Sequence, residues 1–458
     1  MFKILTKRTA GIFPSLINHD KRVFLVFCIV VSFLIVDTMI HYVSDLIVPA
    51  LISIPSIVLF TITICVSIFG LIVIMEFVKS KSKEITEKDS QIRIIQRVIT
   101  SIQYVLITIL VIVTLEILLT YQYHTALLIM DDAVISTTSA VALGLFSYKL
   151  FSWFRLNRRS IIVLLYGLSF SITAFSILLG HYRDIYLLIL KDPVVNSMSP
   201  VIFPYDYLEP GSFLDILFSA YGYIDTIGFG LLVAATAILL HHYSRRLGKV
   251  KFWIYVTLPL VYNISTLLET AGMYTPTTDT EWFYWWLYIS LNTTAGGILF
   301  GFAFMSVART IREDSSVRQY MTIAAYGFVL LFVSNQVTLV GASYPPVGIA
   351  TFSFLPVATF MIFLGVYSTA VSISQDNQLR KSIRKLATEN SNLFGSIGAA
   401  QLSQDTMRRI DRFKDLVNEQ EKELEQKTGI EANMEEEDIK SIIAEVLQEV
   451  GKTGRTQK

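Results

Sequence analysis

The sequence predicts an all-α polytopic membrane protein that carries a helical soluble tail. Of its 458 residues, 53% are hydrophobic and only 16% are charged, and the mean hydropathy is +0.55. Apolar runs of about 20 residues recur along the chain, each long enough to cross about 30 Å of hydrocarbon as a helix. Charge is concentrated at the end, where residues 376–458 carry 14 Lys/Arg and 16 Asp/Glu. We therefore expect a transmembrane domain over 1–375 and a cytoplasmic tail over 376–458.

Ten spans are predicted from the apolar runs, with charged, proline-rich or glycine-containing segments between them. They lie at about 23–43, 54–78, 99–121, 132–153, 160–180, 213–240, 252–272, 284–308, 320–341 and 351–373. The first run is too long for a signal peptide and no small-residue cleavage site follows it, so we expect it to be retained. An even number of spans places both termini on the same side.

Basic residues identify that side. Five Lys/Arg precede the first span, six follow the second, four follow the fourth, four follow the sixth and three follow the eighth. The opposite loops contain only Arg183 and Lys191. Because cytoplasmic loops of membrane proteins are enriched in Lys and Arg, both termini are predicted to be cytoplasmic, in a multi-pass protein of the plasma membrane.

Acidic residues accumulate on the predicted outer face, which favours the approach of cations. The same excess is also expected from membrane insertion alone, which retains Lys and Arg inside and is indifferent to acids. Four carboxylates lie inside otherwise apolar helices, where an ionised group costs about 2.5–3.5 kcal/mol and therefore needs a partner or a polar cavity. These candidate ligand contacts are Asp37, Glu116, Asp225 and Glu269.

Uncharged polar residues extend this set in spans seven to nine. With Asp225 and Glu269 they would form a hydrophilic seam that either binds a ligand or holds the helices together by hydrogen bonds of about 0.6 kcal/mol each. The candidate contacts in this seam are Asn263, Asn292, Asn335 and Gln336.

Three histidines fall at the outer ends of the first, third and fifth spans. Imidazole together with carboxylate is a ligand set for zinc or copper, although no local His-x-x-x-His spacing is present. The alternative is a pH-sensing role, because histidine titrates near neutrality. The candidates are His41, His124 and His181.

The outer segment 181–212 begins with an apolar stretch that is too short and too interrupted to span a bilayer, and we expect it to lie on the membrane surface. The two cysteines, Cys28 and Cys65, lie within predicted spans and indicate neither a disulfide framework nor a metal pair.

The tail is predicted to continue the tenth helix, to break around 395–400 and to resume as a helix over 403–428. A partial seam of coiled-coil spacing in that helix indicates a possible homodimer: Met407, Ile410, Phe413, Val417 and Leu424. A final amphipathic helix presents one apolar face, which either docks a cytoplasmic protein or folds back on the tail. Its residues are Ile439, Ile442, Ile443, Val446, Leu447 and Val450.

The region around the last span and the start of the tail carries a recognisable pattern. Its residues are Tyr344, Pro345, Pro346, Val347, Gly348, Ser353, Phe354, Gly365, Tyr367, Ser374, Gln375, Asp376, Leu379, Arg380, Ser382, Ile383, Arg384 and Lys385. The pattern resembles uncharacterised polytopic membrane proteins of ammonia-oxidising archaea, over about the last third of the chain. The architecture is also loosely similar to the multi-span input regions of sensor histidine kinases. Here, however, the chain has no histidine after His242 and no nucleotide-binding loop follows, so it cannot autophosphorylate as they do.

Enzyme signatures are absent from the sequence: there is no Walker A loop, no Gly-x-Ser-x-Gly elbow, no His-Glu-x-x-His and no cysteine cluster. Nothing indicates a cofactor or nucleic-acid binding. Two function classes remain. The first is a sensor, in which an outer polar pocket biases the tail and the tail docks a separate effector. The second is a ten-span transporter of a small cationic or neutral solute, because five plus five spans of opposite orientation fit inverted repeats.

Overall fold

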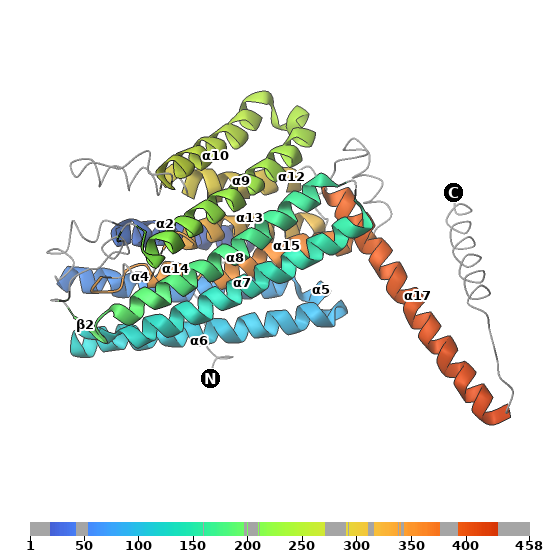
Figure 1. Ribbon diagram of the computed structural model, residues 1–458, viewed down its shortest axis with the longest axis horizontal. Helices are drawn as coiled ribbons and strands as arrows, with labels where there is room; N and C mark the ends of the chain where they lie inside the picture. Colours follow the sequence, from blue (N-terminus) through green and yellow to red (C-terminus); the bar gives the residue numbers. More distant parts are fainter. Residues whose placement is uncertain are drawn as a thin grey trace.

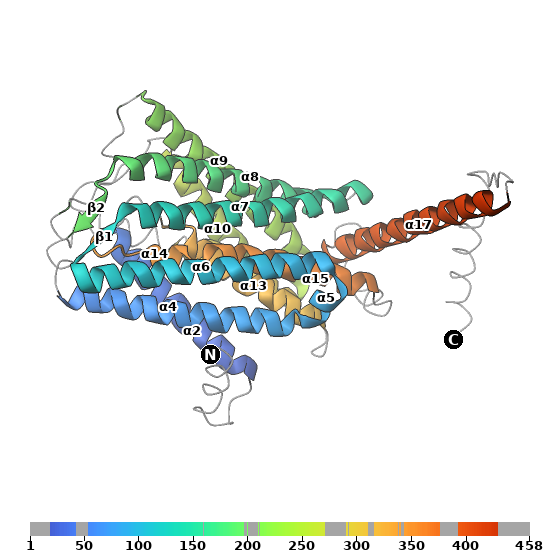
Figure 2. The ribbon, with the colours of Figure 1, turned by 90° about the horizontal axis from the view of Figure 1, so that it is seen from below.

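Long helices running side by side form a bundle in the computed structural model, and one helix, α17, projects from one end (Figures 1 and 2). The structure describes residues 19–42, 54–158, 160–196, 199, 209, 211–270, 290–291, 293–309, 316–337, 339, 343–375 and 393–428. All structural statements below concern these residues.

The chain passes back and forth along the bundle. Its first half contains α2 (His19–Tyr42), α4 (Ile54–Lys81), the short α5 (Lys83–Lys88), α6 (Ser90–Thr120), α7 (Thr125–Leu156) and α8 (Ile161–Leu190). Its second half contains α9 (Phe213–Leu247), α10 (Lys249–Thr270), the π-helical turn η2 (Thr293–Ile298) with α12 (Leu299–Ala308), α13 (Ser316–Ser334), α14 (Ile349–Phe352), α15 (Leu355–Gln375) and α17 (Leu393–Thr428).

Local sequence explains where several of these helices begin and end. Asp89 caps α6 by accepting a hydrogen bond from the Gln91 backbone N–H at 2.9 Å. Tyr121 ends the same helix in a left-handed conformation with φ 56°. Gly248, with φ 85°, separates α9 from α10, because a residue without a side chain adopts such a backbone angle without strain.

Eight described helices are long and apolar enough to cross a membrane, which confirms the prediction of a multi-span helical protein. Their outward sides carry apolar side chains that are more than half exposed, such as Phe24, Phe69 and Tyr104, as expected for contact with lipid. The predicted seventh span corresponds to α10, which contains Pro259 and several polar residues, and the eighth to the short apolar segment Gly296–Ala308. Ten spans therefore stay a prediction.

Three predicted boundaries are wrong. The helix of the fourth span begins at Thr125 instead of 132, and the fifth runs on to Leu190, so that residues 181–190 extend α8 rather than lying on the surface. Among the charged residues at these positions, Asp132 pairs with His181 and Arg183 with Asp184 inside the bundle. The predicted break at 395–400 lies inside α17, where Gly398 lets the helix pack directly on Ile373 of α15.

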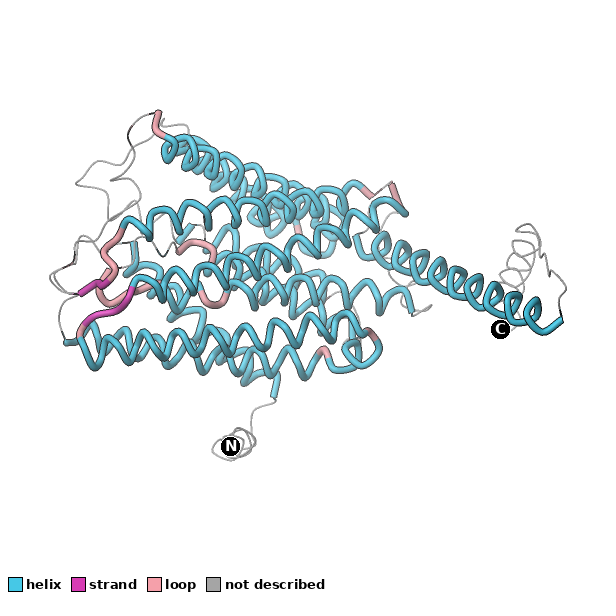
Figure 3. The backbone as a smooth tube through the Cα atoms, turned by 60° about the horizontal axis from the view of Figure 1, so that its bottom comes forward, coloured by secondary structure: helices cyan, strands magenta, loops and turns pink. Residues whose placement is uncertain are grey.

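A two-stranded antiparallel pair joins two loops at one end of the bundle, opposite to the end from which α17 leaves (Figures 2 and 3). β1 (Gln122–His124) pairs with β2 (Val194–Asn196), with Tyr123 opposite Val195. The Tyr123 hydroxyl donates to the Ser343 carbonyl at 3.1 Å. The two ends of the bundle are called the β1–β2 end and the α17 end below.

The core is centred on α15, whose most apolar 18-residue window is 100% buried, whereas that of α2 or α6 is 39% buried. Glycine permits its close packing on α13. A Cβ at Gly365 would lie 2.6 Å from the Tyr320 carbonyl oxygen, and one at Gly327 would lie 2.9 Å from the Ile362 nitrogen. A helix surrounded by others on all sides is well placed to relay a displacement between the two ends.

Candidate functional site

Buried charges gather among α7, α8 and α9 near the β1–β2 end. Asp132 of α7 is 1% exposed, and its Oδ2 atom lies 2.5 Å from Nδ1 of His181 in α8. Its other oxygen accepts a hydrogen bond from Ser136, one turn further along α7, at 3.1 Å. The carboxylate therefore fixes the orientation of the imidazole ring and joins the two helices.

A second ion pair lies on α8. The Arg183 guanidinium contacts Oδ1 of Asp184 at 2.6 and 2.7 Å, and both side chains are buried. The same guanidinium lies over the ring of Tyr221 in α9, 4.7 Å from its centroid, and 5.5 Å from that of Phe218. Charged groups inside transmembrane helices are rare and mark functional sites by default.

Asp225 of α9 completes the ionic cluster, which we define as Asp131, Asp132, His181, Arg183, Asp184, Tyr221 and Asp225. Its carboxylate accepts from the Ser176 hydroxyl of α8 at 3.3 Å. Tyr221 is an electrostatic neighbour of both Asp225 and Asp184, and Asp184 of both Asp132 and His181. The predicted contact Asp225 thus belongs to a site that spans four to six form, rather than spans six to nine.

Asp131 differs from the other members of the cluster. It is 0% exposed, and neither of its carboxylate oxygens has a hydrogen-bond partner among the described residues. Most buried polar groups in proteins have at least one partner, so an exception of this kind calls for an explanation.

The remaining predicted contacts lie outside this cluster. Asp37 is held by the Thr351 hydroxyl at 2.7 Å, where α2 meets α14, and Glu116 accepts from the His124 backbone and ring nitrogens at 3.1 and 3.0 Å. Asn263 donates to the Thr226 carbonyl at 2.9 Å and thereby joins α10 to α9.

The rest of the predicted seam does not form one site. Gln336 donates to the Phe332 carbonyl at 2.6 Å, and the Asn335 backbone N–H donates to the Leu331 carbonyl at 2.9 Å. Glu269 lies near the end of α10, and its side chain is outside the described residues, as are Asn292 and the whole amphipathic segment 439–450. The contact of Asn263 agrees with the packing alternative for the seam, whereas that of Gln336 is local to the end of α13.

The three histidines are not brought together. His41 contacts the Val347 carbonyl at 3.1 Å, His124 contacts Glu116 and His181 contacts Asp132. Among the described residues, no three His, Cys, Asp or Glu side chains are arranged to hold a metal ion. The shared metal site is therefore corrected to three separate contacts, because each ring is held by a different partner: Val347, Glu116 or Asp132.

A contact region at the α17 end joins the tail to the bundle. The Trp153 indole of α7 donates to Oε1 of Gln401 in α17 at 2.9 Å, and the Gln404 amide donates to the Ser152 hydroxyl at 3.2 Å. Leu393, Ile397 and Ala400 of α17 are buried against the bundle. We call this region the tail junction. It attaches the N-terminal part of α17, from Leu393 to Gln404, to α7 and α15.

The tail junction also includes the start of α6. The Tyr367 hydroxyl of α15 donates to Oδ2 of Asp89, the residue that caps α6, at 2.7 Å. The Lys149 ammonium of α7 lies 5.5 Å from the centre of the Tyr367 ring. Electrostatic interactions link Lys149 to Asp89 and also to Asp405 and Arg408 of α17. Four helices therefore meet there.

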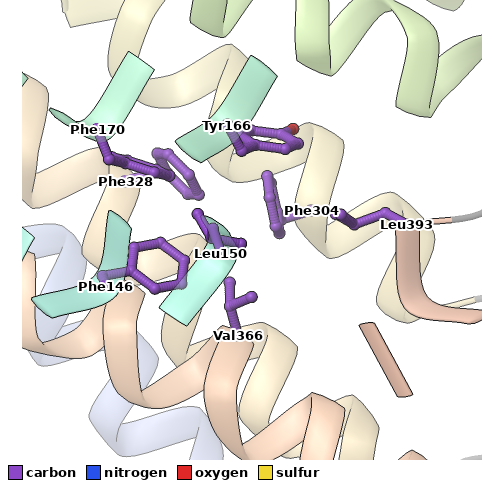
Figure 4. A pocket seen from close by; sticks show the side chains of 8 residues that line it. All are labelled: Phe146, Leu150, Tyr166, Phe170, Phe304, Phe328, Val366 and Leu393. Carbon is purple, nitrogen blue, oxygen red and sulfur yellow. The ribbon is translucent and has the colours of Figure 1, made fainter. Parts of the chain in front are cut away.

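A small apolar cavity of about 10 Å³ lies between the two regions (Figure 4). Figure 4 shows aromatic rings turned toward one another around it, with Leu393 of α17 at one edge. Its lining consists of Phe146, Leu150, Tyr166, Phe170, Phe304, Phe328, Val366 and Leu393. This volume is that of about one water molecule, and an apolar lining keeps such a space dry, so the cavity is a packing feature and not a ligand site.

Comparison with known proteins provides no family for this chain: no protein-family model, no curated protein and no solved structure matches it. The chemistry must therefore be argued from the site itself. Sequence reasoning missed Asp131, Asp132, Arg183 and Asp184 as members of one site because it placed them at or beyond the span ends. The sequence did contain a signal: two acids lie at the start of the fourth predicted span, and a base and an acid lie just beyond the end of the fifth.

Proposed function

We propose that this protein is a membrane sensor, in which the ionic cluster responds to a small solute and α17 conveys the response to a separate effector. The observation that carries the proposal is that α7 belongs to both regions. It contributes Asp132 to the ionic cluster and, 21 residues later, Trp153 to the tail junction. At 1.5 Å per residue, these positions are about 32 Å apart along one helix.

The chemistry of the two regions supports this direction of coupling. A change of charge at Asp132 or His181 alters a buried ion pair between α7 and α8, and buried pairs are sensitive to the loss of either partner. A small shift of α7 then acts on Trp153 and Gln401 directly, because the helix between them, α7, is uninterrupted. Packed interfaces convert such shifts into discrete alternative arrangements.

The topology in this proposal is the ten-span arrangement with both termini in the cytoplasm. The distribution of Lys and Arg supports it: α5 and the adjoining ends of α4 and α6, which carry Lys79, Lys83 and Arg93, lie at the α17 end of the bundle. The β1–β2 end with the ionic cluster then faces outward. The tail helix would dimerise through 403–428 and dock an effector through 439–450; we retain both as proposals.

The transporter alternative has less support. Inverted repeats lead to interrupted helices at corresponding positions of both halves. In the described residues, the interruptions are the η2 turn before α12, Pro259 in α10 and the α14–α15 junction, all in the second half. The helices α4, α6, α7 and α8 of the first half are continuous. Sensing is therefore the function that we retain.

Spin-label distances on the full chain in lipid nanodiscs test the sensor proposal. Cys28 and Cys65 are replaced by serine, and labels are placed at the exposed positions Arg97 of α6 and Arg412 of α17. Asp132→Asn removes the charge that holds His181 and is expected to change the distance distribution between the labels. Glu116→Gln removes a carboxylate at the same end that contacts His124 of β1 and, among the described residues, no member of the ionic cluster, so it is expected to leave the distribution unchanged. Identical distributions for all three proteins would disprove the coupling.

A further inference from the structure

The strongest unexplained feature of the molecule is Asp131. Its side chain lies in the second turn of α7, is 0% exposed and offers two oxygens without a hydrogen-bond partner among the described residues. An ionised carboxylate in an apolar interior is strongly disfavoured unless a positive charge compensates it. The fold therefore needs a positive ligand at this position.

The neighbouring side chains do not supply that charge. Arg183 is engaged by Asp184, and His181 by Asp132. The electrostatic neighbour of Asp131 is the like-charged Asp132. Counted over the ionic cluster, four carboxyl groups face one guanidinium and one imidazole, so the cluster is short of positive charge even when His181 is protonated.

The charge that is missing at Asp131 itself indicates the class of ligand. A divalent cation is balanced by more than one carboxylate, and among the described residues no three His, Cys, Asp or Glu side chains are arranged to hold a metal ion. A single carboxylate whose neighbour is already paired needs one unit of positive charge. The ligand is then a proton or a monovalent ion.

We propose that Asp131 is the binding carboxylate for one small monovalent cation, either a proton or an alkali-metal ion. This inference rests on the proposed sensor function and deepens it by naming the class of solute. Occupation neutralises Asp131 and relieves its repulsion with Asp132, which strengthens the contact between α7 and α8. The charged or titratable groups at this end of the surrounding elements include Asp132 on α7, His181, Arg183 and Asp184 on α8, Tyr221 and Asp225 on α9, Glu116 on α6, and Tyr123 and His124 on β1.

Thermal unfolding of the full chain in nanodiscs tests the proposal. Melting temperatures are compared in sodium, potassium and choline chloride at matched ionic strength, and then between about pH 5 and about pH 8, the range in which histidine also titrates. A ligand that binds only the folded state raises the melting temperature. We expect a rise of several degrees with sodium or potassium over choline, or with acid.

Three variants isolate the residue. Asp131→Asn should remove the dependence, Asp131→Glu should keep it with a changed midpoint, and Glu116→Gln should leave it unaltered. An infrared band from a protonated carboxyl that disappears in Asp131→Asn identifies the proton, whereas cation dependence without that band identifies the alkali-metal ion.

The proposal is overturned if the wild-type melting temperature responds to none of these cations, or if Asp131→Asn responds as the wild type does. A wild-type protein that responds to none of these cations is enough to overturn the proposal, so the test does not depend on whether a variant folds. The readout does not involve α17. Cation binding with unchanged label distances would therefore leave this site in place and remove the sensor function.

Discussion

The two ends of the bundle are held together by different chemistry. The ionic cluster joins α7, α8 and α9 through full charges in a buried setting, with the Asp132–His181 and Arg183–Asp184 pairs at its centre. The tail junction joins α6, α7, α15 and α17 through close packing and the Trp153–Gln401 hydrogen bond, together with the partly buried charges of Lys149, Asp89 and Asp405. The charges of the ionic cluster are more deeply buried, so its internal energy depends more strongly on the addition or removal of one unit of charge.

The two regions therefore differ in what they respond to. A buried ion pair is sensitive, because removing one partner leaves the other charged and unsolvated. A neutral hydrogen bond contributes about 1 kcal/mol and tolerates small displacements. The ionic cluster is thus suited to detect a solute. The tail junction is suited to transmit a movement into α17 with only a small loss of free energy. The experiments below are ordered from the largest expected effect to the smallest.

Breaking the Arg183–Asp184 pair should have the largest effect. Arg183→Met leaves Asp184 buried without its partner and should lower the free energy of unfolding by about 3–5 kcal/mol. The measurement is unfolding in mixed micelles followed by circular dichroism. The double variant Arg183→Met/Asp184→Leu should recover most of the loss. A double variant as unstable as the single one would show that packing on Tyr221, and not charge, dominates.

Removing the indole donor at the tail junction should have a smaller effect on stability and a larger one on the tail. Trp153→Phe loses the hydrogen bond to Gln401 and should cost about 1–1.5 kcal/mol. Limited proteolysis should cleave α17 faster in this variant. The control Glu116→Gln, which lies outside both regions, should leave α17 protected; equal cleavage in both variants would show that the Trp153–Gln401 hydrogen bond does not hold the tail.

The hydrogen bond between α15 and α6 should contribute less. Tyr367→Phe removes the donor to Asp89, which keeps its capping bond to Gln91, and should cost about 1 kcal/mol. In a double-mutant cycle with Asp89→Asn, the coupling energy should account for most of that loss. A coupling energy near zero would mean that Lys149, and not Tyr367, is the partner of Asp89.

The smallest effect concerns pH and the β1–β2 end. Burial lowers the pKa of Lys191, just beyond α8, from its usual 10.5 to about 8. Because the folded pKa lies below the unfolded one, its charged form opposes folding, and stability is gained as the pH rises from about 8 to about 10.5. Lys191→Met should flatten the rise in the free energy of unfolding over that window, a rise of about 1 kcal/mol per pH unit. An unchanged slope would exclude Lys191 as its source.

Much of the fold was predictable from patterns along the chain. Long apolar runs predicted the transmembrane helices, since a backbone in hydrocarbon must satisfy its own hydrogen bonds. Asp225 was predicted as a contact because an acid deep in an apolar run needs a partner. The limits of α7 and α8 were missed because charges at 131–132 and 183–184 suggested loops, although Asp132 pairs with His181 across the two helices and Arg183 pairs with Asp184 on α8.

The sequence by itself determined that the chain contains several helices long and apolar enough to cross a membrane and that 403–428 is helical, because hydropathy and helix propensity act over neighbouring residues. Which residues meet was decided only by the tertiary structure. Asp132 and His181 are 49 positions apart, and Trp153 and Gln401 are 248 apart. Such contacts depend on how helices rotate and tilt against one another, and the small residues that govern this packing, such as Gly365 against α13, act through shape rather than through any pattern along the chain.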